Sequence, residues 1–229
     1  MTLEGMTALL LALWQGDSAF PSGSFAFSNG LEGAVALGGP LDRRRLAQLV
    51  ANTLRFRWAS ADRLALMRAY RTTEMPRIGA LDRLFEAATT AAPLRSGSRR
   101  NGSAFLLAHS RLGTPGAADL RAAVASGQAL GHLPVAQGWV WRHCEMDEPS
   151  AVATSAYTMA TSMVQAAVRL GALGAIEAQG ALRDSLPLIV ALASAKPEVD
   201  EAPAFSTMTP WIDIAGARHS RAPLRLFSN

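Results

Sequence analysis

One short segment of the chain carries side chains that can bind metals or act as nucleophiles. Residues 143–147 read His-Cys-Glu-Met-Asp, and Cys144 is the single cysteine of the chain. An imidazole and a thiolate suit nickel and related metals, so a loop at this point would make His143 and Cys144 candidate ligands. In a helix the two side chains would point in different directions, because neighbouring residues do not share a helix face. A metal site here therefore depends on a loop.

The same cysteine raises a catalytic alternative. A thiolate activated by His109, His132 or His219 would make the chain a hydrolase-like enzyme. A lone cysteine at the end of a helix is more often a buried or half-buried packing residue. The sequence also lacks a Walker-type glycine loop, so it has no such motif with which to bind GTP. We expect no catalytic residues and a protein that is not an enzyme.

A denser group of distinctive residues lies near the N-terminus, in residues 16–32. Pro21 and Gly23 favour a bend, and a helix is expected to begin near Ser24, with a serine available as its cap. Gly30 has no side chain and would let another backbone come close. Three side chains would share one face of this helix by their three- and four-residue spacing: Phe25, Ser28 and Glu32.

A second distinctive group forms a helix near the C-terminus. Thr209-Pro210 is a good helix start, because threonine can cap and proline in the first turn loses no needed donor. Asp213 falls in the expected first turn, and Arg218 and His219 fall in the last turn. This order of charges suits the helix dipole. Helix stabilisation alone accounts for much of this group.

The tail that follows, residues 220–229, has a different character. It ends in the apolar pair Leu226 and Phe227 beside Arg225, with no later helix to cover them. An exposed apolar chain end is often a docking segment. Neither terminal group has the arrangement of a catalytic site, a phosphate loop or a metal-ligand set. We therefore expect the two groups to form a surface for protein partners.

The elements that position these groups are expected to be helices. Alanine and leucine are abundant, and a helix over residues 41–59 would bury Leu46, Leu49, Val50 and Leu54. Pro187 should kink or split a late apolar helix. These patterns predict a single all-α domain over residues 1–229, a bundle of about ten helices. The clearest apolar stripe alternates steps of four and three: Val152, Ala156, Met159, Met163, Ala166 and Leu170.

Charge and composition narrow the classes of partner. The formal net charge is +4, but the arginines are scattered, whereas a nucleic-acid surface more often shows a basic stripe with aromatics. We therefore expect solvated helix faces and no nucleic-acid partner. A helical nucleic-acid-binding module that uses the dispersed arginines remains the alternative. Such a module would bind with an affinity that falls steeply with salt and would not need the last ten residues.

The composition also bears on the cellular compartment of the chain. A single cysteine cannot form an intrachain disulfide, which favours a reducing compartment. The first basic residue is Arg43, so residues 6–14 fit a first helix better than a secretory signal. The most apolar late stretch, residues 186–195, is too short to span a membrane. We expect a soluble cytoplasmic protein with no membrane partner.

Taken together, these motifs resemble those of the UreF family of urease accessory proteins. The N-terminal motif matches at Pro21, Gly23, Phe25, Ser28, Gly30, Leu31 and Glu32. The C-terminal helix and tail match at Pro210, Asp213, Ile214, Arg218, His219, Arg225, Leu226, Phe227 and Ser228. Residues 132–138 and 164–174 also match in part, so the resemblance spans nearly the whole chain.

The resemblance implies a non-catalytic, all-helical urease maturation factor that dimerises. Proteins of this family bind a second accessory protein, UreD (UreH in some organisms), and recruit the GTPase UreG. The assembly passes nickel to apo-urease as GTP is bound and hydrolysed. Nickel and GTP would then belong to the assembled complex, and this chain would hold no stable cofactor.

The resemblance also implies which residues meet the partners. The tail around Arg225, Leu226 and Phe227 would order against UreD/UreH. The N-terminal motif and the helix from Asp213 to His219 would form or support the shared surface. The partner-binding residues implied in this way are Pro21, Gly23, Phe25, Ser28, Gly30, Glu32, Asp213, Arg218, His219, Arg225, Leu226 and Phe227.

Overall fold

The structure is a computed structural model that describes residues 3–196, 205–207, 209–219 and 226–227, without the side chains of Glu4 and His219. All regular secondary structure in these residues is helical, which confirms the all-α prediction. The first half contains α1 (Leu3–Gly16), the 3-10 turn η1 (Ser24–Ala26), α2 (Leu31–Gly38), α3 (Arg43–Thr53), the π-helix η2 (Leu54–Asp62), α4 (Arg63–Arg71) and α5 (Met75–Ala88). The second half contains α6 (Ala92–Arg111), α7 (Ala117–Ala125), α8 (Leu133–His143), α9 (Glu148–Arg169), α10 (Ala175–Ser194) and α11 (Pro210–His219).

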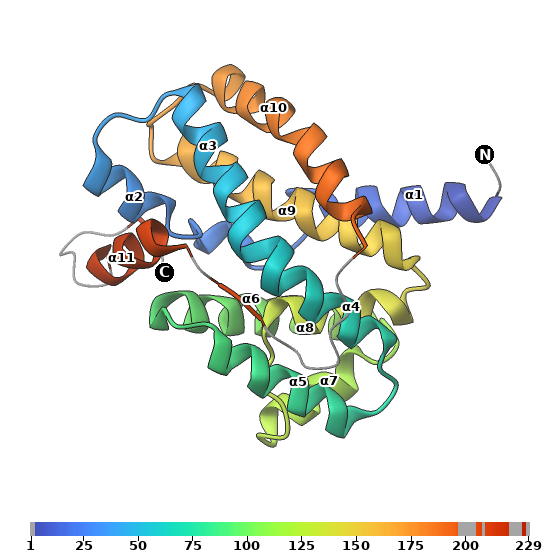
Figure 1. The fold of residues 1–229 in the computed structure, drawn as a ribbon. Coiled ribbons are helices and arrows are strands. Elements are labelled where there is room, and N and C mark those ends of the chain that lie inside the picture. The colour runs from blue at the N-terminus through green and yellow to red at the C-terminus, as the bar shows by residue number, and fades with distance from the viewer. Residues whose placement is uncertain (1–2, 197–204, 208, 220–225, 228–229) are drawn as a thin grey trace.

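Helix α9 runs through the middle of the fold (Figure 1). It packs against α10, α1 and α4, while α8 packs against α4 and α6. The expected stripe on α9 faces this core: Val152, Ala156, Met163 and Ala166 are buried, and Met159 and Leu170 are half-buried. Because the stripe consists mainly of small and flexible residues, neighbouring helices can lie close to α9.

Helices α3, η2 and α4 form one continuous helix, which extends beyond the helix over residues 41–59 that the sequence predicted. Leu54 and Arg63, where the segments join, both have right-handed helical dihedral angles. The expected core positions Leu46, Leu49, Val50 and Leu54 are buried, as predicted. The π segment also brings the buried residues Arg57 and Asp62, five positions apart, into an ion pair of 3.5 Å.

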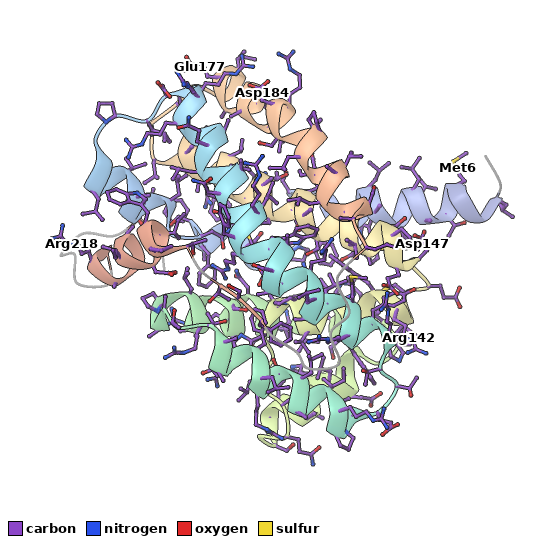
Figure 2. The ribbon with its side chains drawn as sticks, in the orientation of Figure 1. Met6, Arg142, Asp147, Glu177, Asp184 and Arg218 are labelled. Carbon is purple, nitrogen blue, oxygen red and sulfur yellow. The ribbon has the colours of Figure 1, made fainter. Side chains whose placement is uncertain are left out.

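Helix α1 projects away from the rest of the fold, and Met6 lies on its outer part (Figure 2). Leu3, Leu10 and Leu13 are exposed by 85%, 59% and 61%, so α1 presents apolar side chains to solvent. The base of α1 is fixed by Gln15, whose Oε1 accepts from Trp141 Nε1 at 2.8 Å. Among the described residues, no helix combines the length and apolarity needed to cross a membrane.

One local expectation is wrong. No helix runs from Ser24 to Glu32: after η1 the chain is extended at Phe27, and Asn29 and Gly30 have φ of 53° and 82°. Two successive left-handed residues cannot belong to a right-handed helix, so α2 starts only at Leu31. At Pro187, where a kink or a split was expected, α10 is not split and continues to Ser194.

Candidate functional site

The two groups of distinctive residues meet in the fold, because α2 packs against α11 (Figure 1). Gly30 lies against Ile212, and a Cβ atom at Gly30 would lie 2.5 Å from Ile212 Cγ2. Gly33 lies against Ala215, where a Cβ atom would lie 2.3 Å from the carbonyl oxygen. The close approach expected at Gly30 is therefore present. Gly33, which the motif reading did not single out, makes a tighter one.

Glu32 joins α2 to the chain's own C-terminal tail. Its carboxylate accepts hydrogen bonds from the backbone N–H of Leu226 at 2.8 Å and of Phe227 at 3.1 Å. Phe227 is 3% exposed, whereas Leu226 is 62% exposed. The end of the tail thus packs against its own chain through one side chain and presents the other to solvent.

Arg169, at the end of α9, connects the N-terminal motif to the tail. Its guanidinium carbon lies 3.9 Å from the centre of the Phe25 ring and 4.4 Å from that of Phe227, within the range of cation–π attraction. Arg169 also donates to the carbonyl oxygen of Phe25. We call Phe25, Glu32, Arg169 and Phe227 the tail cluster. The resemblance covered Arg169 only as part of a matching stretch, and nothing in its local sequence marks its contacts with both ends of the chain.

The remaining residues of the two motifs support this surface or lie beside it. Ser28 is buried, and its hydroxyl accepts from the N–H of Glu32 at 3.3 Å. Asp213 accepts from the Thr209 hydroxyl at 3.2 Å, and its pKa is raised by burial. Arg218 is exposed at the end of α11 (Figure 2). Pro21 is exposed, and Gly23 packs against Ala104 of α6. Arg225 and the side chain of His219 lie outside the described residues.

The metal candidates are not arranged as ligands. His143 ends α8, and its Nδ1 lies 2.7 Å from the carbonyl oxygen of Trp139. Cys144 is half-buried, and burial raises the pKa of its thiol to about 11. A thiol with that pKa is protonated at neutral pH and is neither a ready nucleophile nor a ready ligand. The described residues also contain no group of three or more His, Cys, Asp or Glu placed to hold a metal ion.

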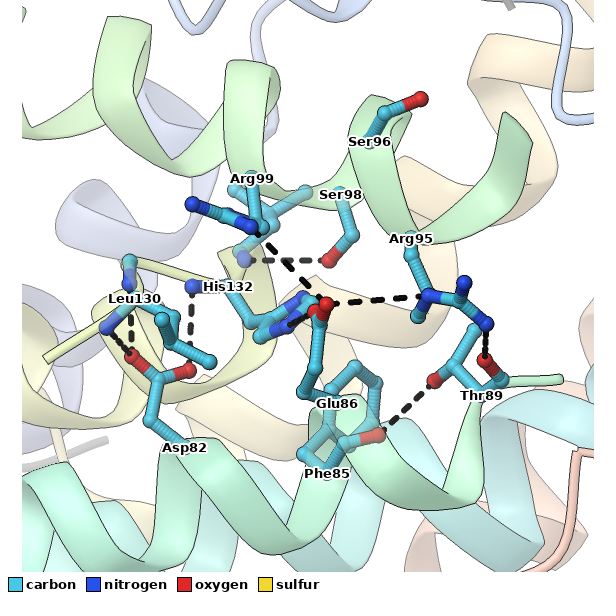
Figure 3. A network of polar contacts seen from close by, with 12 residues as sticks. Asp82, Phe85, Glu86, Thr89, Arg95, Ser96, Ser98, Arg99, Leu130 and His132 are labelled. Carbon is cyan, nitrogen blue, oxygen red and sulfur yellow. Dashed lines mark hydrogen bonds and ion pairs between the residues drawn. The ribbon is translucent and has the colours of Figure 1, made fainter. Parts of the chain in front are cut away.

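The two buried histidines have structural partners. His109 lies between Thr114 Oγ1 at 2.9 Å and Gln15 Oε1 at 3.1 Å, and burial lowers its pKa to about 4. His132 Nε2 lies 2.6 Å from Glu86 Oε2, as Figure 3 shows. Burial also lowers the pKa of His132, although the negative charges of Asp82 and Glu86 act in the opposite direction. These contacts do not involve Cys144, and the side chain of His219 lies outside the described residues. The described geometry therefore gives the catalytic alternative no support.

Asp82 fixes the segment that precedes α8. Its carboxylate accepts from three successive backbone N–H groups at 2.7, 2.6 and 3.1 Å (Figure 3), those of Leu130, Gly131 and His132. This arrangement holds the matching stretch at residues 132–138 in place. The polar network in Figure 3 is therefore a structural feature of the fold.

Much of the arginine content is used inside the fold. Four arginines donate to carbonyl groups at or just beyond the C-terminal ends of helices, where backbone acceptors lack helical partners. Arg45 donates to the carbonyl oxygen of Gly38 at the end of α2, and Arg63 donates to that of Leu192 near the end of α10. Arg95 donates to the carbonyl oxygen of Thr89 just after α5, and Arg142 donates to that of Thr72 just after α4. The arginine count therefore gives little support to a nucleic-acid surface.

Comparison with known proteins identifies the family. Residues 41–186 match the family model described as UreF. A protein of Trichodesmium erythraeum named "Urease accessory protein UreF" is 34% identical, with 96% of each chain covered. A Cereibacter sphaeroides protein of the same name is 32% identical over 97% of this chain and 99% of its own length. "Urease accessory protein UreF 1" of Brucella melitensis is 27% identical over 99% of this chain and 95% of its own length. The chain therefore belongs to the UreF family of urease accessory proteins.

Proposed function

We propose that this chain is a non-catalytic scaffold of urease maturation in the cytoplasm. In this proposal it binds UreD (UreH in some organisms) and recruits the GTPase UreG. The assembled complex then delivers nickel, as cargo, to apo-urease while GTP is bound and hydrolysed. Family membership supports the role in urease maturation, and the site geometry supports a role through partner surfaces.

The observation that carries this proposal is the joining of the two chain ends at the tail cluster. The side chains of Phe25 and Leu226 are exposed by 69% and 62%, whereas Phe227 is buried. Trp211 and Ile214 are exposed by 48% and 54% on α11, whose Ile212 and Ala215 pack inward. An apolar surface held in place by buried anchors is typical of a protein interface. We assign this surface to UreD/UreH.

The test removes one exposed apolar side chain from the surface. Leu226→Ser leaves Phe227 and its backbone bonds in place, and Ile176→Ser, at a residue that is 87% exposed on α10, is the matched control. We expect Leu226→Ser to weaken the binding of UreD/UreH at least tenfold and Ile176→Ser to leave it unchanged. Equal affinity of both variants for UreD/UreH would refute the assignment of the surface.

We further propose that a second copy of this chain covers α1. The exposed leucines of α1 lie beside an apolar groove of about 510 Å³. Trp14 and Phe20 line it together with Leu107 of α6 and with Leu112, the residue that follows α6. Because a two-fold dimer uses the same surface on both subunits, α1 of each copy can lie against the groove of the other. Burying exposed leucines on α1 would supply the apolar area that such a dimer needs.

A further inference from the structure

A partly open cavity of about 90 Å³ lies between the N-terminal loop and the helices around it. Its wall includes the aromatic rings of Trp58 and Trp141, from η2 and α8. Asp17 and Ser18, which are exposed, also line the cavity, so it can be reached from the surface at this loop. The tail cluster lies outside its lining.

Several buried polar atoms of the lining residues lack hydrogen-bond partners among the described residues. The donors are Nε and Nη1 of Arg57 and Nε2 of Gln15, and the acceptors are Oδ2 of Asp62 and Oδ1 of Asn101. All four residues are at most 6% exposed. The amide of Gln15 can be oriented with certainty, because its Oε1 accepts from the indole N–H of Trp141, which can only donate. Buried polar groups of this kind require a polar occupant.

The charges of the cavity select against an ion. Arg57 Nε and Asp62 Oδ2 are 3.5 Å apart, too far for a good hydrogen bond but close enough for their charges to compensate each other. Because these opposite charges compensate each other, the pair offers no net attraction to an anion or to a cation. The open positions include both donors and acceptors, so the matching occupant is uncharged and carries both kinds of group.

The cavity has room for more than one water molecule. Its volume of about 90 Å³ exceeds the roughly 30 Å³ that one water occupies in the liquid, so a small organic molecule also fits. A primary carboxamide carries a carbonyl acceptor beside an amino donor. We propose that the cavity is a binding site for a small carboxamide, with the carbonyl facing Arg57 and Gln15 and the amino group facing Asp62 and Asn101.

The site would connect parts of the fold that the proposed function treats separately. Gln15 ends α1, Arg57 and Asp62 belong to the continuous helix, and Asn101 belongs to α6. Asn29 of the N-terminal motif also lines the cavity. A bound carboxamide would hold these four segments together. The proposal goes beyond the scaffold function and does not depend on it.

Three isosteric probes test the site on the full-length chain: acetamide, acetate and acetamidinium. They share a shape and differ in charge, so they separate a neutral site from an anion or cation site. The readout is the pair of indole N–H resonances of Trp58 and Trp141 in ¹H–¹⁵N NMR spectra, assigned with single Trp→Phe variants. For a ligand of this size we expect a Kd on the order of 1 mM.

We expect acetamide to shift both indole resonances to saturation and the two ions to bind at least tenfold more weakly. Stronger or equal binding of acetate or acetamidinium would overturn the proposal, because the site would then select a charge. The absence of a saturable shift with any probe would also overturn it and would mean that water alone fills the cavity.

A double variant shows whether the shifts come from the cavity. Arg57→Met with Asp62→Leu removes both charges and three of the unpaired atoms while it keeps the volume similar. We expect at least a tenfold loss of acetamide affinity. The control, Arg43→Met with Asp184→Leu, removes an exposed ion pair of 2.6 Å between α3 and α10 and should leave the affinity unchanged. If the first variant fails to fold, Asn101→Leu replaces it. Unchanged affinity in the folded cavity variant contradicts the proposal.

Discussion

The carboxylate of Glu32 accepts a hydrogen bond from the backbone N–H of Phe227, 195 residues further along the chain. The neighbouring N–H of Leu226 donates to the same carboxylate. One side chain of α2 therefore binds the end of the chain without using any side-chain atom of the tail. This contact, together with Arg169, turns two distant sequence motifs into one surface.

Weakening this contact should weaken partner binding. Glu32→Gln removes the negative charge and leaves one acceptor oxygen for two N–H donors. Because bonds to a charged acceptor contribute roughly 1.5–3 kcal/mol, we expect about a tenfold loss of affinity for UreD/UreH with no loss of helix content. Glu177→Gln, at an exposed site on α10 (Figure 2), is the control. Isothermal titration calorimetry measures both, and equal affinities would contradict the role of Glu32.

The stacking of Arg169 should protect the tail from proteolysis. Arg169→Lys keeps the charge but removes the flat guanidinium that faces the rings of Phe25 and Phe227. We expect carboxypeptidase to trim the variant several times faster than the unmodified chain, as followed by mass spectrometry. Arg121→Lys, at an exposed position of α7, should not change the rate. Equal trimming of all three proteins would mean that Arg169 does not hold the tail.

The contact between α2 and α11 should not tolerate a methyl group. In Gly33→Ala the new Cβ would lie 2.3 Å from the carbonyl oxygen of Ala215, so the helices must separate. We expect a loss of about 2 kcal/mol in the free energy of unfolding. Gly216→Ala on α11 has no atom within 4 Å of the new Cβ and should be neutral or slightly stabilising. Urea unfolding of the two variants makes the comparison, and similar midpoints would show that the close contact is absent.

Two buried groups should make stability depend on pH in opposite directions. Burial raises the pKa of Asp62 from 3.8 to about 6, although the positive charge of Arg57 acts to lower it. The carboxyl group of Asp62 therefore holds its proton more tightly in the folded chain than in the unfolded chain. The resulting stabilisation is complete below pH 3.8 and is lost as the pH rises through about 6. Burial lowers the pKa of His109 from 6.5 to about 4, so its contribution is complete above pH 6.5 and is lost as the pH falls through about 4.

Asp62→Asn isolates the first of these contributions. Relative to the variant, the unmodified chain should gain on the order of 2 kcal/mol of stability between pH 7 and pH 4. Urea unfolding at several pH values measures the difference between the two proteins. A difference that stays constant with pH, or grows in the other direction, would show that Asp62 does not titrate as its burial implies.

The proposed dimer should depend on α1. Leu10 is 59% exposed on this helix, and Leu10→Glu would place a charge in the proposed contact. We expect the variant to be monomeric at concentrations where the unmodified chain is dimeric, as shown by analytical ultracentrifugation. Val190→Glu, at a residue that is 64% exposed on α10, should keep the dimer. A dimeric Leu10→Glu variant would exclude α1 as the interface.

Local signals predicted some of these elements correctly. Thr209-Pro210 marks the start of α11 at Pro210, and the stripe around Ala156 marks the buried face of α9. Both depend on rules that operate within a few residues. The close approach at Gly30 followed from the absence of a side chain, although the partner helix could not be known from the sequence.

The features that sequence reasoning missed depend on contacts between distant segments. Arg169 bonds Phe25 across 144 positions, and no local pattern reports such a contact. The break before Leu31 depends on a left-handed Asn29, whose side chain donates to Ser162 Oγ at 2.6 Å. The π segment likewise could not be predicted from the sequence. In the sequence, Arg57 and Asp62 resemble residues of a solvated helix face, whereas in the fold the surrounding helices bury them.

The most direct test of the scaffold role is the mass of the assembly. The full-length chain is mixed with UreD/UreH and UreG from the same organism, and the complex is sized by light scattering after chromatography. We predict a stoichiometric complex that contains two copies of this chain, and its loss when the chain is ended at Arg225. A well-folded chain that forms no complex with UreD/UreH would contradict the scaffold role.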